Sequence, residues 1–361
     1  MTEHAEYLKR RYFGSLNGLR CLAIMAVLWY HGPGMRGGSI LSRNPFTGVQ
    51  LFFAISGFVI ATRLIRERDS RGGIWLSKFY LRRSLRILPL YYTVLAVHVV
   101  LAWQVAAGSP RQVEFNAGMP AFLTFTSNWF VAAGSLFGFS WSIATQEQFY
   151  WSWPLVESYF KRYSTLAVVL GIAMTQALRF GLIPGFPDGS LPHRIIASVP
   201  LTIGLGILLA HLLHSPTGYR VAAAILGWRG ASLAALSLLV WLISSGIPRI
   251  WIEVWIVVVV GACVVKEDHW LQRVLTSWPV QYVGVVSFGV YLFHGLVYDT
   301  LQELSVFEAH SVAQFGACLA VSVAVASASY HYYESWFLKR EERLSPVVAQ
   351  TVQYARAVLP Q

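Results

Sequence analysis

Charged residues are scarce in this 361-residue sequence, where Asp, Glu, Lys and Arg together make up 12%. That is about half the share found in an ordinary soluble domain. Apolar residues make up 55%, and 14 Trp, 17 Tyr and 21 Phe add an aromatic content typical of membrane interfaces and packed helices. The composition excludes an ordinary soluble domain and indicates a membrane protein.

Cysteine is also scarce. Cys21, Cys263 and Cys318 all lie within apolar stretches and are widely separated. This spacing favours neither a zinc site nor a disulfide framework, so we expect small packing residues and no metal.

Acidic residues are outnumbered, with 17 Asp and Glu against 28 Lys and Arg and a net charge of +11. A basic balance can indicate nucleic-acid binding, but here the basic residues fall in short segments between apolar runs. Membrane topology explains that placement better, so we expect contact with membrane lipids and no nucleic-acid partner. The sequence shows no internal repeat, and no small-residue cleavage site follows its first apolar run, which we therefore interpret as a retained helix.

The apolar runs predict an all-α polytopic membrane protein with about ten transmembrane helices. The predicted spans are 16–34, 46–63, 84–106, 139–160, 164–183, 195–214, 230–246, 248–265, 280–299 and 312–337.

The positive-inside rule orients these spans. Placing the N-terminus in the cytoplasm leaves six basic residues outside, and the other 22 of the 28 inside. The six are Arg36, Arg43, Arg111, Arg179, Arg194 and Arg249. We therefore expect both termini in the cytoplasm, a membrane domain over 1–340, a cytoplasmic tail over 341–361, a cytoplasmic loop over 63–83 and an external segment over 107–140.

Two ionisable residues, Arg20 and His31, lie inside the first span. Eleven residues of α-helix make three turns plus roughly 20°, so both project from one face about 16 Å apart. Ionisable groups at bilayer depth are costly and mark functional sites. His31 is able to exchange a proton near neutral pH.

The densest positive charge runs from Arg63 to Arg86. For Arg63 to Lys78 we favour orientation of the chain and contact with anionic lipid headgroups. Arg82, Arg83 and Arg86 stand where the chain enters the bilayer, and Arg83 and Arg86 share a helix face. Guanidinium groups there suit the phosphates of a cytoplasmic cofactor.

Two further polar features lie within predicted spans. Glu147 stands in an aromatic stretch, where a carboxylate is paired with an arginine, protonated or exposed to a wet cavity. Ser287, Tyr291 and His294 lie at i, i+4 and i+7, which makes one polar stripe. That stripe suits a substrate path or hydrogen bonds between helices.

Together these stretches resemble the acyltransferase 3 family of membrane acyltransferases, in order along nearly the whole chain. The similar segments are Leu16 to Arg20 with Tyr30 and His31, Gly48 to Phe58, Arg83 to Arg86, Trp141 to Tyr150 and Ser287 to His294. Asn17 and Gln50 stand where the family often has Asp, and Gln146 replaces the first Glu of a usual pair. The chain resembles a stand-alone member without a fused esterase-like domain.

The resemblance implies transfer of an acyl group, most often acetyl, from acyl-CoA to a carbohydrate hydroxyl. It implies His31 as the catalytic base, or as the carrier of an acyl-histidine intermediate. Glu147 would support His31. The residues expected to bind the donor are Arg20, Arg82, Arg83 and Arg86. Those expected to line the acceptor path are Tyr150, Ser287, Tyr291 and His294.

The sequence therefore predicts an acyl-CoA-dependent O-acyltransferase of the bacterial cytoplasmic membrane that modifies a surface or secreted glycan. One alternative acceptor is a small glycosylated metabolite such as a macrolide. A polytopic carrier or flippase is an alternative of another class, although it would show symmetry between its halves. A purely structural subunit would not require Arg20, His31 and Glu147 at depth.

Overall fold

Helices form every regular element in the computed structural model, which describes residues 3–10, 12–36, 44–104, 107–132 and 134–344. The prediction of an all-α fold is confirmed for these residues, and their long apolar helices are consistent with a membrane protein. The predicted tail over 341–361 lies almost entirely outside them. The chain divides into two units, one of residues 1–62 and 205–361 and the other of 63–204. Each unit is described separately.

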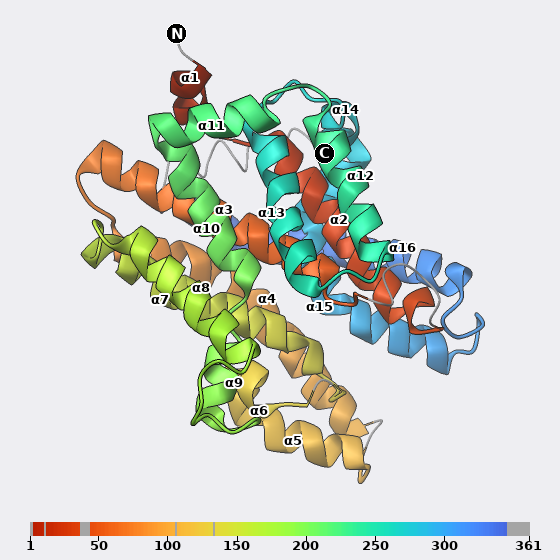
Figure 1. Cartoon of the computed structure of the whole chain (residues 1–361). Coiled ribbons are helices and arrows are strands. Elements are labelled where there is room, and N and C mark those ends of the chain that lie inside the picture. The colour runs from red at the N-terminus through yellow and green to blue at the C-terminus, as the bar shows by residue number, and fades with distance from the viewer. Residues whose placement is uncertain (1–2, 11, 37–43, 105–106, 133, 345–361) are drawn as a thin grey trace. The chain divides into compact units, whose positions relative to one another are not determined.

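The first unit is built around a central helix, α2 (Gly14–His31). The other helices that belong to it are α1 (Glu3–Lys9), the first part of α3 (Thr47–Arg71), most of α10 (Leu201–His214), α11 (Pro216–Leu226), α12 (Ala231–Ser244), α13 (Arg249–Val265), α14 (Gln272–Leu275), α15 (Trp278–Glu303), α16 (Val312–Ala328) and α17 (Ser335–Leu344). A 3₁₀ turn (Pro33–Arg36) follows α2, and a π-helical turn (Ser329–Glu334) joins α16 to α17. Helix α2 contacts α13, α14, α15 and α16 (Figure 1).

Glycine brings the neighbouring helices unusually close to α2. A Cβ atom at Gly48 of α3 would lie 2.5 Å from the carbonyl oxygen of Ala23. Gly284 of α15 packs in the same way against the backbone of Asn17, and Gly18 of α2 packs against Leu275. Small residues permit this approach in membrane proteins because helix association there depends on close packing. The backbone of α2 is therefore fixed on several sides.

The second unit consists of long antiparallel segments with short helices at one end. Its elements are the rest of α3, α4 (Leu76–Gln104), α5 (Pro110–Leu123), α6 (Ser127–Phe130), a 3₁₀ turn (Gly138–Ser140), α7 (Trp141–Tyr159), α8 (Ser164–Arg179) and α9 (Leu191–Ala197). Figure 1 shows α7 beside α8, with α5, α6 and α9 gathered near one end of α4.

A helix lies in each of the ten predicted spans, but the number ten is not confirmed. Four helices are long and apolar enough to cross a membrane, and up to seven spans result if each of three bent pairs counts as one. The other three predicted spans correspond to α7, α8 and α13. Helices α8 and α13 have 16 and 17 residues, short of the roughly 20 that a bilayer requires. Helix α7 contains two Glu and two Gln side chains, which make it less apolar than a typical membrane span.

One predicted loop is wrong in its local structure. The predicted loop over 63–83 is mainly helix, because α3 continues to Arg71 and α4 begins at Leu76. Leu64 and Ile65 are buried, so packing extends α3 beyond its apolar run. The external segment over 107–140 contains α5 and α6. Helix α11 was not predicted, and it meets α12 at a bend of 74°.

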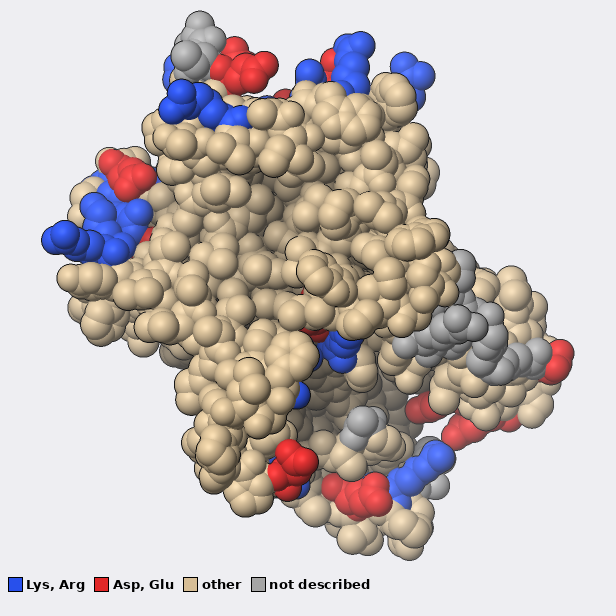
Figure 2. Space-filling view, viewed as in Figure 1, with Lys and Arg blue, Asp and Glu red and all other residues tan. Residues whose placement is uncertain are grey.

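The face of the first unit seen over α12 and α13 carries almost no charge (Figure 2). Helix α13 contains Arg249 and Glu253 near its start and no further charged residue up to Val265. The next three residues are Lys266, Glu267 and Asp268. Most side chains of this uncharged segment are buried within the unit.

Candidate functional site

His31 is the last residue of α2 and is only partly buried. Its Nδ1 lies 2.9 Å from the carbonyl oxygen of Val27, one turn earlier. Since a carbonyl oxygen only accepts, Nδ1 carries the proton. In the neutral ring Nε2 then holds the lone pair, as a general base requires.

The neighbouring ring is His294 of α15. The two imidazole centroids are 4.8 Å apart with the planes at 67°. His294 is fully buried, and its Nδ1 donates to the carbonyl oxygen of Tyr291, so its Nε2 also presents a lone pair in the neutral form. The structure thus joins the end of α2 to the polar stripe predicted on α15.

The polar residues predicted on α15 are present as one stripe, and some of them form hydrogen bonds within their own helix. Ser287 is buried and donates to the carbonyl oxygen of Gly284 at 2.9 Å. The ring of Tyr291 lies 5.3 Å from that of His294. Tyr298 fixes α15 against α2, since its hydroxyl donates to the carbonyl oxygen of Leu28 at 2.8 Å.

A hydrogen bond from a helical histidine to the preceding turn is not by itself diagnostic. His98 and His214 make the same contact, with Val94 and Ala210 respectively, both at 2.8 Å. The ring of His98, however, lies against Phe137 at 4.6 Å. A second imidazole in contact is what distinguishes His31.

Arg20 lies in a polar network toward the other end of α2. Its Nη1 donates to Oδ1 of Asn17 at 2.7 Å, and Asn17 Nδ2 donates to the Tyr12 hydroxyl at 2.8 Å. The Tyr12 hydroxyl in turn donates to Oε1 of Gln281 at 3.1 Å. Sequence reasoning missed Gln281, although an amide near the start of an apolar helix is the same kind of signal as Glu147.

Three predicted site residues come together in the second unit. Glu147 is 4% exposed, and Arg83 of α4 is close enough for its charge to act on the carboxylate. The Arg83 guanidinium lies 4.7 Å from the ring centre of Tyr150, whose hydroxyl accepts a hydrogen bond from Gln146. The charge of Arg83 thus acts on Glu147, but the described residues include no ion pair between these two side chains.

One oxygen of Glu147 has no partner among the described residues. Oε1 is buried and accepts no hydrogen bond from them. Buried carboxylate oxygens are normally satisfied, so an unsatisfied one requires an explanation such as an unseen water or a ligand. This observation suits a carboxylate that meets another molecule.

The remaining two arginines differ from each other. Arg82 forms a loose ion pair with Glu67, at 3.9 Å, and Glu67 also meets Arg71 at 3.8 Å. Arg86 is exposed and makes no ion pair or hydrogen bond within the described residues. Arg86 is therefore available to an incoming anion, whereas Arg82 is already partnered.

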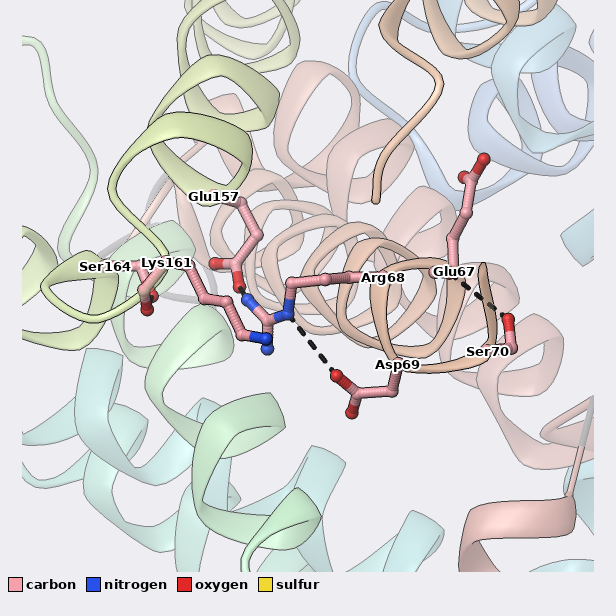
Figure 3. A network of polar contacts seen from close by, with 7 residues as sticks. All are labelled: Glu67, Arg68, Asp69, Ser70, Glu157, Lys161 and Ser164. Carbon is pink, nitrogen blue, oxygen red and sulfur yellow. Dashed lines mark hydrogen bonds and ion pairs between the residues drawn. The ribbon is translucent and has the colours of Figure 1, made fainter. Parts of the chain in front are cut away.

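A buried ion pair was also missed by sequence reasoning. Arg68 of α3 forms an ion pair with Glu157 of α7, whose side chain is fully buried (Figure 3). The Nε of Arg68 also lies 3.4 Å from Oδ1 of Asp69. Arg68 thus pairs inside the protein and is not simply an orienting charge or a lipid contact. Glu157 lies in an apolar segment like Glu147, which is the signal that would have identified it.

No group of three or more His, Cys, Asp or Glu side chains that could hold a metal occurs among the residues that the structure describes. The three cysteines are free and buried, as expected of packing residues.

The chain belongs to the acyltransferase 3 family, whose acyltransferase domain matches residues 13–331. It is similar to the peptidoglycan O-acetyltransferase OatA of Listeria monocytogenes, with 25% identity over 79% of this chain and 49% of the relative. A Staphylococcus aureus protein provisionally named an O-acetyltransferase is 26% identical over 92% of this chain and 58% of the relative. A Bacillus subtilis protein, YrhL, is provisionally named a peptidoglycan O-acetyltransferase. It is 26% identical over 90% of this chain and 54% of the relative.

The chain thus spans about half the length of these curated relatives. No solved structure gives a significant match to it.

Proposed function

We propose that this protein is a membrane O-acyltransferase of the bacterial cytoplasmic membrane that moves an acetyl group from acetyl-CoA to a hydroxyl of a cell-surface glycan. Family membership supports acyl transfer, and the names of the relatives favour a carbohydrate acceptor, with peptidoglycan first among the glycans. The observation that carries the mechanism is the contact of the His31 ring with a second imidazole, His294, while the Nδ1 bond to Val27 leaves Nε2 of His31 as its basic atom.

In the proposed reaction, His31 Nε2 takes the proton of the acceptor hydroxyl as its oxygen attacks the thioester carbonyl. The new C–O bond forms, the C–S bond breaks, and the coenzyme A thiolate takes the proton from the imidazolium to leave as the thiol. General-base help of this kind contributes about 10² to 10⁴ in rate.

The other predicted site residues would serve the donor, the acceptor and the developing charge. Arg86 and Arg83 offer guanidinium groups to the phosphates of coenzyme A, with Arg82 and Arg20 as further contributors from sequence. Tyr150, Ser287 and Tyr291 are the candidates to line the acceptor path. Glu147 would support the charged form of His31, as a carboxylate does in a triad.

The test is acetyl transfer by the purified protein in proteoliposomes, with acetyl-labelled acetyl-CoA and a peptidoglycan fragment as acceptor. We expect labelled glycan and free coenzyme A in equal amounts, and a loss of about 10²-fold or more in His31→Ala. His98→Gln is the matched control, because His98 makes the same helical hydrogen bond among aromatic rings and should retain activity. Transfer to a macrolide glycoside but not to the glycan would contradict the proposed acceptor and identify a small glycosylated metabolite instead.

A second measurement distinguishes direct transfer from an acyl-histidine. Incubating the protein with labelled acetyl-CoA and no acceptor should leave it unlabelled if His31 acts as a base. Label retained on His31 would replace the base by a covalent carrier.

A further inference from the structure

Two histidines that lie far apart in the sequence meet inside the first unit. His31 is at the end of α2 and His294 is within α15, and their rings are in contact at 4.8 Å. The contact is held from both sides, by the Tyr298 hydroxyl on Leu28 and by the close approach of Gly284 to Asn17. The relative placement of the two rings is thus fixed by packing that involves neither of them.

Both rings are oriented in the same way by their own helices. Each donates Nδ1–H to a backbone carbonyl of the preceding turn, Val27 for His31 and Tyr291 for His294. In the neutral state each ring therefore presents Nε2 as its basic atom. His294 is fully buried, whereas His31 is partly accessible, so only His31 is placed to meet an acceptor.

A proton taken by His31 creates a cation in a poorly solvated place. An isolated charge there is costly unless a neighbour shares or stabilises it. A neutral imidazole in contact does so through its lone pair, which a phenyl ring lacks. Two like charges at this distance repel, so the pair is suited to hold one proton and not two.

Resting on the proposed function, we infer that His294 is a positioning residue that stabilises the proton held by His31 during acyl transfer. The acceptor O–H bond breaks, its proton binds His31 Nε2, and the resulting charge is shared with His294. The same proton leaves on the coenzyme A thiolate, so the pair ends the cycle neutral. His294 forms no bond to either substrate.

The test compares two replacements that retain different properties of the ring. His294→Gln keeps hydrogen-bonding capacity without a titratable ring, and His294→Phe keeps an aromatic ring in contact without a basic nitrogen. We expect both to lower kcat by about 10- to 100-fold, the range for groups that support a reacting residue, with KM for acetyl-CoA unchanged. His98→Gln is again the control. Full activity in His294→Phe would reduce the contact to packing and overturn the inference.

A double-mutant cycle with His31→Gln measures whether the two losses of activity are coupled. A merely structural role of His294 would not produce such coupling. If His294 acts through His31, removing both should cost no more than removing His31 alone. Additive losses, or a fall in activity matched by a fall in folded yield for both His294 variants, would contradict the inference. The proposed function fails separately, if the unmodified protein transfers no acetyl group at all.

Discussion

Gly284 of α15 packs directly against the backbone carbonyl of Asn17 in α2, at a distance that leaves no room for a side chain. This contact sets the separation of the two helices that carry His294 and His31.

The first prediction follows from that contact. Gly284→Ala should destabilise the protein by about 1 to 3 kcal/mol, because a methyl group would push α15 away from α2. Gly316→Ala is the matched control, since Gly316 lies in α16 with open space around it and alanine is the better helix former there. Thermal unfolding in detergent measures both. Equal melting temperatures for the two variants would disprove the proposed helix contact.

The second prediction separates Arg83 from Arg86. Arg86→Ala should weaken coenzyme A binding by about 1.5 to 3 kcal/mol, as for a lost charge-assisted hydrogen bond, and leave thermal stability unchanged because Arg86 is exposed. Arg83→Ala should weaken binding and also lower stability, since Arg83 acts on buried Glu147 and stacks on Tyr150. Calorimetry with coenzyme A measures binding.

Lysine at either position should restore binding only partly, because it lacks the planar fork. Arg111→Ala is the control, as an exposed arginine of the same unit on α5. Unchanged coenzyme A binding in the Arg83/Arg86 double variant would assign the pair to the lipid interface.

The third prediction concerns Glu147. Glu147→Gln keeps the shape of the side chain and should lower kcat with little change in KM for acetyl-CoA, the sign of an interaction made mainly in the transition state. The alternative is a folding role, in which loss of one partner of a buried pair destabilises by about 3 to 5 kcal/mol. In that case folded yield and activity would fall together, and Arg83→Met combined with Glu147→Leu would recover the yield.

The fourth prediction is a pH dependence of stability. His269 lies between α13 and α14, where burial lowers its pKa below the ordinary 6.5 and the charge of Asp268 partly opposes that shift. Below that ordinary value the unfolded chain binds a proton that the folded protein resists, so stability should fall as the pH drops below about 6.5. His269→Gln should flatten this part of the profile. A melting temperature equally sensitive to acid in the variant would exclude His269 as the cause.

The sequence predicted the positions of the long helices well, because apolar runs determine them. The predicted 280–299 lies within α15 over Trp278–Glu303. The sequence prediction failed where a helix contains many charged residues, as α3 does beyond Arg63. Hydropathy assigns such residues to loops. Helix α11 was missed because its 11 residues are too few for a membrane span, although Ser215 before Pro216 is a helix-start signal and its side chain does accept from the Gly218 amide.

The site was predicted residue by residue but not as a set of contacts. Arg20, His31 and Glu147 were identified because ionisable groups are costly in apolar segments. The meeting of His31 with His294 depends on how α2 and α15 pack, and no local pattern encodes it. The same holds for the charge of Arg83 acting on Glu147, which joins α4 to α7.

The burial of all three native thiols has a practical consequence for mapping topology. Cys21, Cys263 and Cys318 are 7%, 2% and 0% exposed, so a membrane-impermeant maleimide should react with introduced cysteines and spare the native ones. Arg111→Cys should then label in intact cells, and Arg86→Cys only after the membrane is opened. The wild-type chain thus serves as its own unreactive background, and the side of the membrane on which Arg86 lies becomes directly measurable.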